Sequence, residues 1–549
     1  MPIQDPTFIP KQTDPNAGSV DPIPGGQAAE TARRAPGQRV LTAKEREQRQ
    51  LALGPTVPSK QEAMCECSKV IHFSVFFDGT GNNRAEEMGK PANERALSNI
   101  AKLHDAHKET QDNISANYIP GVGTPYPEIG DSGGKLGMAL GAGAGKRIKK
   151  ALELLDQEIA KVPTEQKIRL INITVFGFSR GAAQARAFIR DLAKLCQAEG
   201  EAYLYKSKPL RIAFAGLFDT VCSAYNTEPN AKESYFGGHN GWAEGMQIPP
   251  MVEQTVHMNA AHELRRRFPL DSTRIDANYP DNTVEIWYPG VHSDVGGGYS
   301  PQYQGKENSI SRFALNHMFD VAFAAGVLFD KIESLRPNVQ DEFNKDNPQL
   351  RAAFNAYIDA VPVKSGAMEV VQAAHMGLFH RWLKTRVLTR AELPSTQRLQ
   401  QARSTAETSV ADLKAKRRAL LQRYAVTDRN GYHVAPQGKE EIEKNTDLLK
   451  KSKEAADEAD DALSSLTKED HKYLEDMADI KDRAKAGERL SLRERTLLEA
   501  WDNDSQLPSA VADFFDSFAH DSVAHFHYDT SRLSDWRTIY FGDTKYKPS

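Results

Sequence analysis

Short apolar runs alternate with helical stretches between residues 70 and 300, and each apolar run predicts a buried strand. The expected strands cover 70–77, 167–176, 210–217 and 283–289. Helical periodicity precedes three of these strands, at 147–160, from Arg180 onward and at 252–267. Apolar strands separated by helices are typical of a mostly parallel sheet with helices on both faces. We therefore expect one α/β unit here.

The rest of the chain changes character several times. Pro, Gly, Gln and charged residues dominate the first sixty positions, a composition that predicts a flexible arm. Helical patterns dominate from 308 to about 504, and turn residues at 428–431 predict a long helical hairpin. Aromatic residues return after position 511. The expected parts are 1–60, an arm; 61–390, an α/β domain with a helical extension; 391–510, a hairpin; and 511–549, a segment that packs back on the α/β domain.

Charge and cysteine usage exclude several classes of protein. The 549 residues include 70 Lys and Arg and 74 Asp and Glu, for a net charge of −4, so a nucleic-acid partner is not expected. No run approaches the ~18 apolar residues of a membrane span, and residues 1–10 do not have the pattern of a secretory signal. Cys65, Cys67, Cys196 and Cys222 are too few for a disulfide framework and predict reduced cytosolic thiols. We expect no metal and no cofactor, because no Cys or His pair near Cys65 and Cys67 completes a zinc site.

The strongest chemical signal is Gly-Phe-Ser-Arg-Gly at 177–181, which has the form G-x-S-x-G. It directly follows a predicted strand and directly precedes a predicted helix. A nucleophile elbow needs this order, because the sharp turn lifts the serine hydroxyl above the edge of the sheet. The helix N-terminus behind the serine supplies positive potential for a developing oxyanion. Ser179 is therefore the predicted nucleophile.

A serine nucleophile needs a base, and the base needs an orienting carboxylate. Asp219 follows the next predicted strand, and His292 follows the strand after that, which matches the chain order Ser, Asp, His. Both lie at carboxyl ends of strands, where ligand-binding groups collect in open α/β sheets. Asp294 is an alternative or supporting carboxylate. His520 is a further candidate that we interpret mainly as a packing residue.

The loop after the first strand should supply an oxyanion donor. Its glycines at 79 and 81 expose backbone N–H groups, so we expect an oxyanion hole made by Gly79, Thr80 and Arg180. Asp78 is a supporting candidate, and a metal role for it is weak because further oxygen ligands at calcium-loop spacing are lacking. Residues 141–147 lack the spacing of a phosphate loop. His257 and His262 are five positions apart, which does not suit a zinc helix, and we expect them on a core-packing helix.

Six segments in this order resemble the family-one lipase effectors of type VI secretion systems. They are HFSVFFDGTGNN at 72–83, YIPGVGT at 118–124, VFGFSRGAAQARAF at 175–188, AFAGLFDTV at 213–221, WYPGVHSDVGGGY at 287–299 and FAHDSVAHF at 518–526. The resemblance covers about 70–300 and 511–526. It implies an α/β-hydrolase fold and phospholipase A activity through a triad of Ser179, Asp219 and His292.

The resemblance also implies how such a protein would act. It implies an antibacterial effector stored in the producer's cytoplasm and delivered by a secretion spike protein to the periplasm of a target cell. There it would act on the phospholipid membrane surface and be blocked by an immunity protein. A non-catalytic adaptor on a hydrolase fold, and a hydrolase of soluble esters, remain alternatives. Basic residues at 414–423 of the hairpin would meet anionic head groups, form a solvated face or dock the spike.

Overall fold

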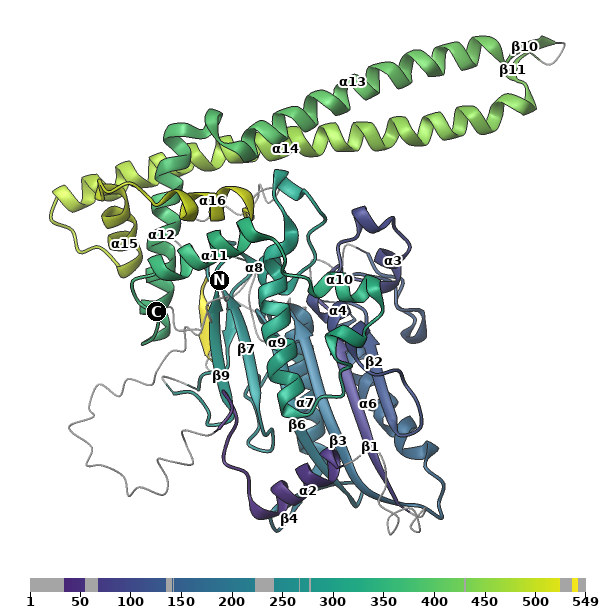
Figure 1. Ribbon diagram of the computed structural model, residues 1–549, viewed down its shortest axis with the longest axis vertical. Helices are drawn as coiled ribbons and strands as arrows, with labels where there is room; N and C mark the ends of the chain where they lie inside the picture. The colour runs from purple at the N-terminus through teal and green to yellow at the C-terminus, as the bar shows by residue number, and fades with distance from the viewer. Residues whose placement is uncertain are drawn as a thin grey trace, which may run out of the picture.

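A central eight-stranded sheet organises the first half of the protein (Figure 1). The computed structural model describes residues 34–54, 68–134, 141, 143–222, 241–265, 267–275, 278–428, 431–523 and 536–541. Six strands run parallel in the order β2-β1-β3-β6-β7-β9, and β4 and β5 add antiparallel at the start of β6. Their bounds are β1 Ser68–Phe77, β2 Ile114–Ile119, β3 Lys167–Phe178, β4 Cys196–Glu199, β5 Ala202–Tyr205, β6 Lys208–Phe218, β7 Thr255–Ala260 and β9 Thr283–Tyr288.

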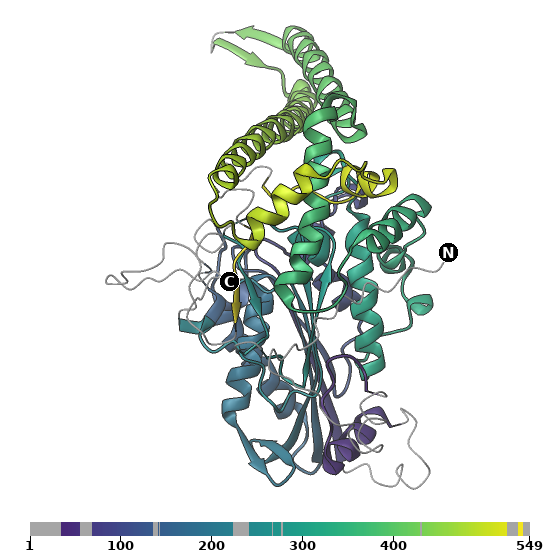
Figure 2. The same ribbon diagram turned by 90° about the vertical axis from the view of Figure 1, so that its left-hand side faces the viewer.

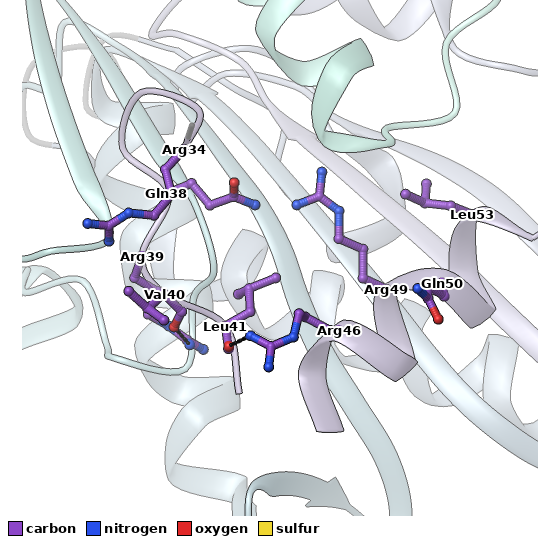
Figure 3. Close-up of a pocket in the computed structure, with 9 residues that line it drawn as sticks. All are labelled: Arg34, Gln38, Arg39, Val40, Leu41, Arg46, Arg49, Gln50 and Leu53. Atoms are coloured by element: carbon purple, nitrogen blue, oxygen red, sulfur yellow. Dashed lines mark hydrogen bonds between the residues drawn. The ribbon is translucent and has the colours of Figure 1, made fainter. Parts of the chain in front are cut away.

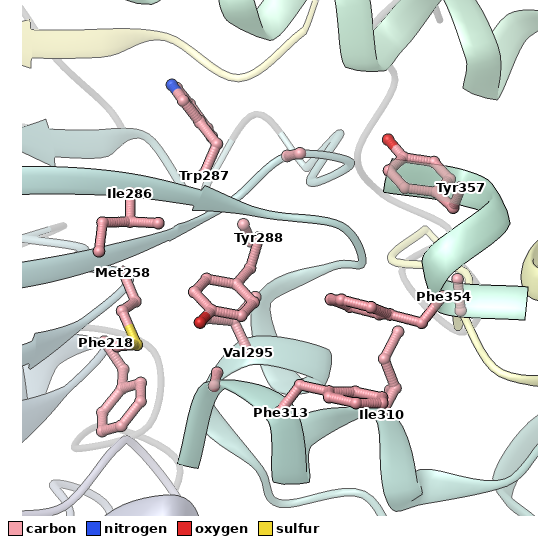
Figure 4. Packing of buried hydrophobic residues seen from close by; sticks show 14 of the residues in the cluster. Phe218, Met258, Ile286, Trp287, Tyr288, Val295, Ile310, Phe313, Phe354 and Tyr357 are labelled. Atoms are coloured by element: carbon pink, nitrogen blue, oxygen red, sulfur yellow. The ribbon is translucent and has the colours of Figure 1, made fainter. Parts of the chain in front are cut away.

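Helices cover both faces of this sheet because its strands are apolar on both sides. Ile173 and Val175 of β3 pack in one core cluster, and Phe176 of the same strand packs in the other, on the opposite face of the sheet. Helices α6 and α7 belong to the first cluster, and α4 and α9 belong to the second, part of which Figure 4 shows. The bounds are α4 Asn99–Ala106, α6 Ala144–Lys161, α7 Arg180–Leu195 and α9 Ser311–Ala325. The predicted mixed α/β architecture is confirmed.

The helix expected over 252–267 is wrong, because this segment contains strand β7. All six residues of β7 are buried, including Thr255, His257 and Asn259, which alternate with apolar residues and share one face of the strand. His257 lies on this strand and not on a helix. Its Nδ1 contacts Glu285 Oε1 of β9 at 2.8 Å, and its Nε2 accepts from the Thr220 N–H at 3.0 Å. Both ring nitrogens of His257 thus have partners, one on β9 and one on the loop after β6.

The flexible arm expected over 1–60 is wrong for residues 34–54, and the other positions of that range lie outside the described residues. Helix α2 (Ala43–Leu53) begins at a capping box formed by Thr42 and Glu45. Arg39 pairs with Glu45 at 2.5 Å and also donates to the Val252 carbonyl, which fixes the segment on the sheet. A pocket of about 530 Å³ opens between α2 and the preceding segment (Figure 3).

The second half of the described chain is mainly helical, as predicted. Its longest elements, α13 and α14, have 30 and 50 residues and form an antiparallel hairpin that projects from the body and ends at a small β-ribbon (Figures 1 and 2). The bounds are α10 Pro337–Phe343, α11 Pro348–Ala360, α12 Met368–Thr389, α13 Pro394–Arg423, β10 Ala425–Asp428, β11 Gly431–Val434, α14 Pro436–Lys485, α15 Leu492–Asp502 and α16 Ser509–Ser517.

After the hairpin the chain returns to the α/β part. Strand β12 (Ile539–Phe541) pairs parallel with β8 (Leu270–Ser272), and Phe514 and Phe515 of α16 enter the core cluster that contains α9. At the root of the hairpin, Arg386 of α12 contacts Glu469 of α14 at 2.7 Å and Asp521 of the returning chain at 3.2 Å. None of the helices in the described ranges is both long enough and apolar enough to cross a bilayer.

Candidate active site

Ser179 stands in a strained turn between β3 and α7. Its backbone has φ 58° and ψ −129°, a left-handed conformation that a non-glycine residue adopts only when its surroundings hold it there. The surroundings are tight: a Cβ on Gly177 would lie 2.5 Å from Ala182 Cα, and one on Gly181 would lie 2.3 Å from the Phe77 carbonyl oxygen. The two motif glycines therefore let α7 start directly against the sheet.

The loop after β1 lies beside this turn, because β1 and β3 are neighbours in register at Phe77 and Gly177. Strand order reverses between β1 and β3, and in open α/β sheets ligands bind at such a point, beyond the carboxyl ends of the strands. The Gly79 N–H donates to Asp78 Oδ1 at 2.7 Å, whereas the Thr80 N–H donates to none of the described groups. Thr80 Oγ1 accepts from Arg180 Nε at 2.6 Å, which ties the loop to helix α7.

Asp78 is a buried anchor of that loop. Besides Gly79, it accepts hydrogen bonds from Ser98 Oγ at 2.8 Å and Tyr118 Oη at 2.5 Å. Burial raises the pKa of Asp78 to about 6, and these hydrogen bonds oppose the rise. Three hydrogen bonds thus hold the Asp78 carboxylate in place beside the loop.

Asp219 and His292 form a buried pair. Asp219 Oδ2 lies 2.6 Å from His292 Nδ1, and Asp219 Oδ1 accepts from the Ala260 N–H at 2.8 Å. Arg537 Nη1 lies 2.8 Å from both carboxylate oxygens. Burial alone would raise the pKa of Asp219, but Arg537 and His292 together lower it below its usual range. Asp219 is therefore ionised and accepts only, so His292 Nδ1 carries the donated proton and Nε2 keeps its lone pair.

His292 is the first residue of the short helix α8 (His292–Gly296). Burial lowers the pKa of His292 below 6.5, against the opposing effect of Asp219, so the ring is neutral at neutral pH. Its ring centroid lies 4.6 Å from that of Phe178, the residue before Ser179. The Ser179 N–H in turn donates to the carbonyl of Phe218, the residue before Asp219. The chain thus brings the three positions to one edge of the sheet.

Asp294 and His520 form a second pair next to the first. His520 Nδ1 lies 2.6 Å from Asp294 Oδ1, and Asp294 Oδ2 accepts from the backbone N–H groups of His520 and Val291. The His520 ring packs on Tyr299 with centroids 4.2 Å apart. His520 Nε2 is buried and has no hydrogen-bond partner in the described part of the chain. Helix α8 therefore supplies the histidine of one pair and the carboxylate of the other.

Neither histidine is hydrogen-bonded to Ser179 Oγ in the structure. The geometry brings Asp219 to His292 and Asp294 to His520, and it brings Gly79, Thr80 and Arg180 beside Ser179, but the proton path from Ser179 is not closed. Hydrogen bonds of this kind often tighten only when substrate is bound.

Sequence reasoning missed Arg537, because a single arginine outside a motif gives no signal and its partner Asp219 is 318 positions away.

The segment YIPGVGT at 118–124 has a structural role that the sequence did not indicate. Gly121 lies so close to the β1 loop that a Cβ there would be 1.8 Å from the Gly79 carbonyl oxygen. The Gly121 N–H donates to Asn82 and the Gly81 N–H donates to Val122, so this segment supports the loop beside Ser179.

No cluster of three metal-binding side chains occurs among the described residues. Cys196 and Cys222 are free thiols, and Cys65 and Cys67 lie outside the described ranges.

The α/β part of the chain thus holds a strained serine between a central strand and a helix, with two buried Asp–His pairs at the same end of the sheet. Residues 72–202 and 194–321 match the family model "T6SS, Phospholipase effector Tle1-like, catalytic domain". The resemblance to type VI secretion lipase effectors is thereby confirmed for this part of the chain.

Solved structures add to this comparison. A crystal structure of an uncharacterised protein from Pseudomonas aeruginosa matches at 22% identity and a TM-score of 0.62, covering 92% of this chain and 83% of that chain. It shows a shared fold. A structure of the Tle1 effector bound to the VgrG spike from the type 6 secretion system has 19% identity and a TM-score of 0.37, covering 56% of this chain and 84% of that chain. None of the curated proteins compared with the sequence matches it significantly.

Proposed function

We propose that this protein is an antibacterial type VI effector with phospholipase A activity, in which an α/β-hydrolase-type domain uses Ser179 as nucleophile. The observation that carries the proposal is the strained backbone of Ser179, held between β3 and α7 by glycines whose replacement would clash with backbone atoms. Strain of this size persists only where the fold maintains it, and a nucleophile elbow places its serine in such a strand-to-helix turn. Ser179 is itself only 4% exposed in this structure.

In this mechanism His292 Nε2 takes the proton of Ser179 Oγ as the oxygen attacks the ester carbonyl carbon. Asp219 holds the ring through Nδ1 and stabilises the imidazolium that forms. The backbone N–H groups of Arg180 and Thr80 bind the oxyanion. The Gly79 N–H is the weaker candidate, because it already donates a hydrogen bond to Asp78. His292 then gives the proton to the leaving lysophospholipid alcohol, and water repeats the sequence to release the fatty acid.

The pair Asp294–His520 is the competing base. Its carboxylate accepts only from N–H groups of His520 and Val291, and the unpaired His520 Nε2 is free to accept a proton. We assign the role to His292 because its ring packs on Phe178, next to Ser179, whereas His520 packs on Tyr299.

Single alanine variants decide between the two histidines. We expect H292A to lose about 10²–10⁴-fold in turnover, the usual contribution of a general base, and H520A to lose much less. The melting temperature of each variant is measured, and turnover is compared only between variants with equal melting temperatures. S179A is the inactive reference. The reverse order would transfer the base role to the second pair.

The phospholipid substrate is supported by the family model over residues 72–321, which describes a phospholipase effector. Fatty acid release from vesicles of defined mixed-chain phospholipid, by wild type and S179A, tests it and reports whether the sn-1 or sn-2 ester is cut. Hydrolysis of short soluble esters alone would favour a soluble-ester hydrolase. Equal release by wild type and S179A would remove the serine mechanism and favour a non-catalytic adaptor.

The proposed partners are a spike protein of the secretion machine, an immunity protein and the target membrane, which the effector would meet from the periplasm. On the hairpin, Lys414, Lys416, Arg418 and Arg423 are exposed and offer positive charge to anionic head groups from both sides of helix α13. Vesicle flotation with all four replaced by glutamine tests this role, with the S179A variant as a binding-competent control. Unchanged flotation would show that these residues do not bind the membrane, and that they face solvent or dock the spike instead.

A further inference from the structure

Arg537 is a fully buried cation whose contacts go to one carboxylate. Its Nη1 lies 2.8 Å from each oxygen of Asp219 and also donates to the Ala260 carbonyl at 3.4 Å. Both side chains of the Arg537–Asp219 pair have zero exposed area. In the described part of the chain, Arg537 Nε and Nη2 have no hydrogen-bond partner. The guanidinium is therefore committed to Asp219.

The segment that carries Arg537 is anchored by other contacts. Strand β12 pairs with β8, Trp536 Nε1 donates to His380 Nε2 at 3.2 Å, and Arg493 donates to the Trp536 carbonyl at 2.8 Å. Burying an arginine with a carboxylate contributes little net stability, because desolvation of both charges offsets their attraction. Stability alone therefore does not explain why an arginine stands at position 537.

We propose that Arg537 is a positioning residue for the Asp219–His292 pair, supplied by the C-terminal segment. It holds the Asp219 carboxylate in the orientation that accepts from His292 Nδ1, and it offsets the negative charge that the imidazole ring faces. This inference rests on the proposed function, in which His292 is the base for Ser179.

The other charged groups around the ring cancel one another. Glu263, on the loop after β7, accepts from the His292 backbone N–H, and Arg265 pairs with Glu263 at 2.9 Å. Asp294, two residues along α8, is occupied by His520. Arg537 is thus the cation that balances Asp219. Without it, a buried negative charge would remain beside His292 and would favour protonation of the ring.

The expected effect of R537Q is therefore an upward move of the acid limb of the pH profile, by about one pH unit, as for the loss of a nearby opposite charge. The measured quantity is the rate at which a soluble fluorophosphonate labels Ser179 between pH 4 and pH 9, which does not depend on a lipid interface. The maximal rate should fall at least tenfold. R537K keeps the charge but reaches both oxygens less well, so its midpoint should stay at the wild-type pH while its maximal rate falls.

W536F is the matched control, because it loosens the same segment by removing the bond to His380 and does not touch Asp219. It should keep the wild-type midpoint and a rate within about twofold. The inference is overturned if R537Q keeps the wild-type midpoint, or if W536F shifts as much as R537Q. If R537Q does not fold, R537K decides: a wild-type rate there overturns the positioning role. Failure of the proposed function is a separate result, namely labelling of H292A at the wild-type rate.

Discussion

Replacing Gly181 by alanine tests whether tight packing, and not the serine alone, creates the elbow. The new Cβ would lie 2.3 Å from the Phe77 carbonyl oxygen and 2.4 Å from that of Asp78. A carbon atom normally approaches such an oxygen to about 3.3 Å, so both carbon–oxygen distances must increase by about 1 Å. Both obstacles are backbone atoms: Phe77 ends β1 in the ladder with β3, and the N–H of Asp78, the next residue, donates to the Ile119 carbonyl of β2. The helix must move away from the sheet.

The size of the effect follows from this displacement. Forcing a methyl group into a packed interior costs about 1–3 kcal/mol, and two backbone contacts place G181A in the upper part of that range. A shift of about 1 Å at the start of α7 also displaces Ser179 and the Arg180 N–H, and misplacement by that distance lowers turnover by about 10²-fold. We therefore expect a lower melting temperature together with a large loss of activity.

The assay pairs thermal unfolding with Ser179 labelling by a fluorophosphonate. G377A is the matched control, since Gly377 lies inside α12 and its added Cβ would meet Thr496 Cγ2 at an ordinary 3.7 Å. The same chemical change there should raise stability by up to about 1 kcal/mol, because alanine favours helix over glycine. Wild-type stability and labelling in G181A would refute the packing argument for the elbow.

Two further predictions concern stability. R386M should lower the free energy of unfolding by about 3–5 kcal/mol in chemical denaturation, because it strands the buried carboxylates of Glu469 and Asp521; a loss below 1 kcal/mol would contradict this. Burial lowers the pKa values of His375 and His380 to about 3, so between pH 6.5 and pH 3 the unfolded chain binds more protons and stability falls as pH falls. The unfolding free energies from chemical denaturation at pH 7 and pH 5 should differ by up to roughly 4 kcal/mol. Equal unfolding free energies at the two pH values would show that these rings titrate normally.

The elbow was predictable because its signals are local. Strand, turn and helix follow one another over a few residues, and the structure ends β3 at Phe178 and starts α7 at Arg180. Asp219 and His292 were predictable as strand-end residues for the same reason. Their pairing at 2.6 Å also depends on the sheet order, which makes β6 a neighbour of β7 and β7 a neighbour of β9.

Prediction failed where long-range burial decides the structure. Strand β7 alternates polar and apolar residues, which is a strand pattern, but it covers only six residues of the segment interpreted as a helix, and Glu285, which contacts His257, comes from another strand. Helix α2 was missed because its sequence is charged, and it folds only because Arg39 and Glu45 pair against the sheet. Arg537 has no motif at all, and only the return of the chain to β8 brings it to Asp219.

The long hairpin is inserted between the α/β part and the C-terminal segment that carries His520 and Arg537, and one buried ion cluster joins the three. Arg386 of α12 contacts Glu469 of α14 and Asp521, the residue after His520. The Gln304 side chain further holds Asp521, accepting from its N–H at 2.8 Å and donating to its carbonyl at 2.9 Å. Displacing α14 without moving Asp521 would leave buried charges unpaired, which costs several kcal/mol. The root of the hairpin and the loop that carries His520 therefore keep their positions together.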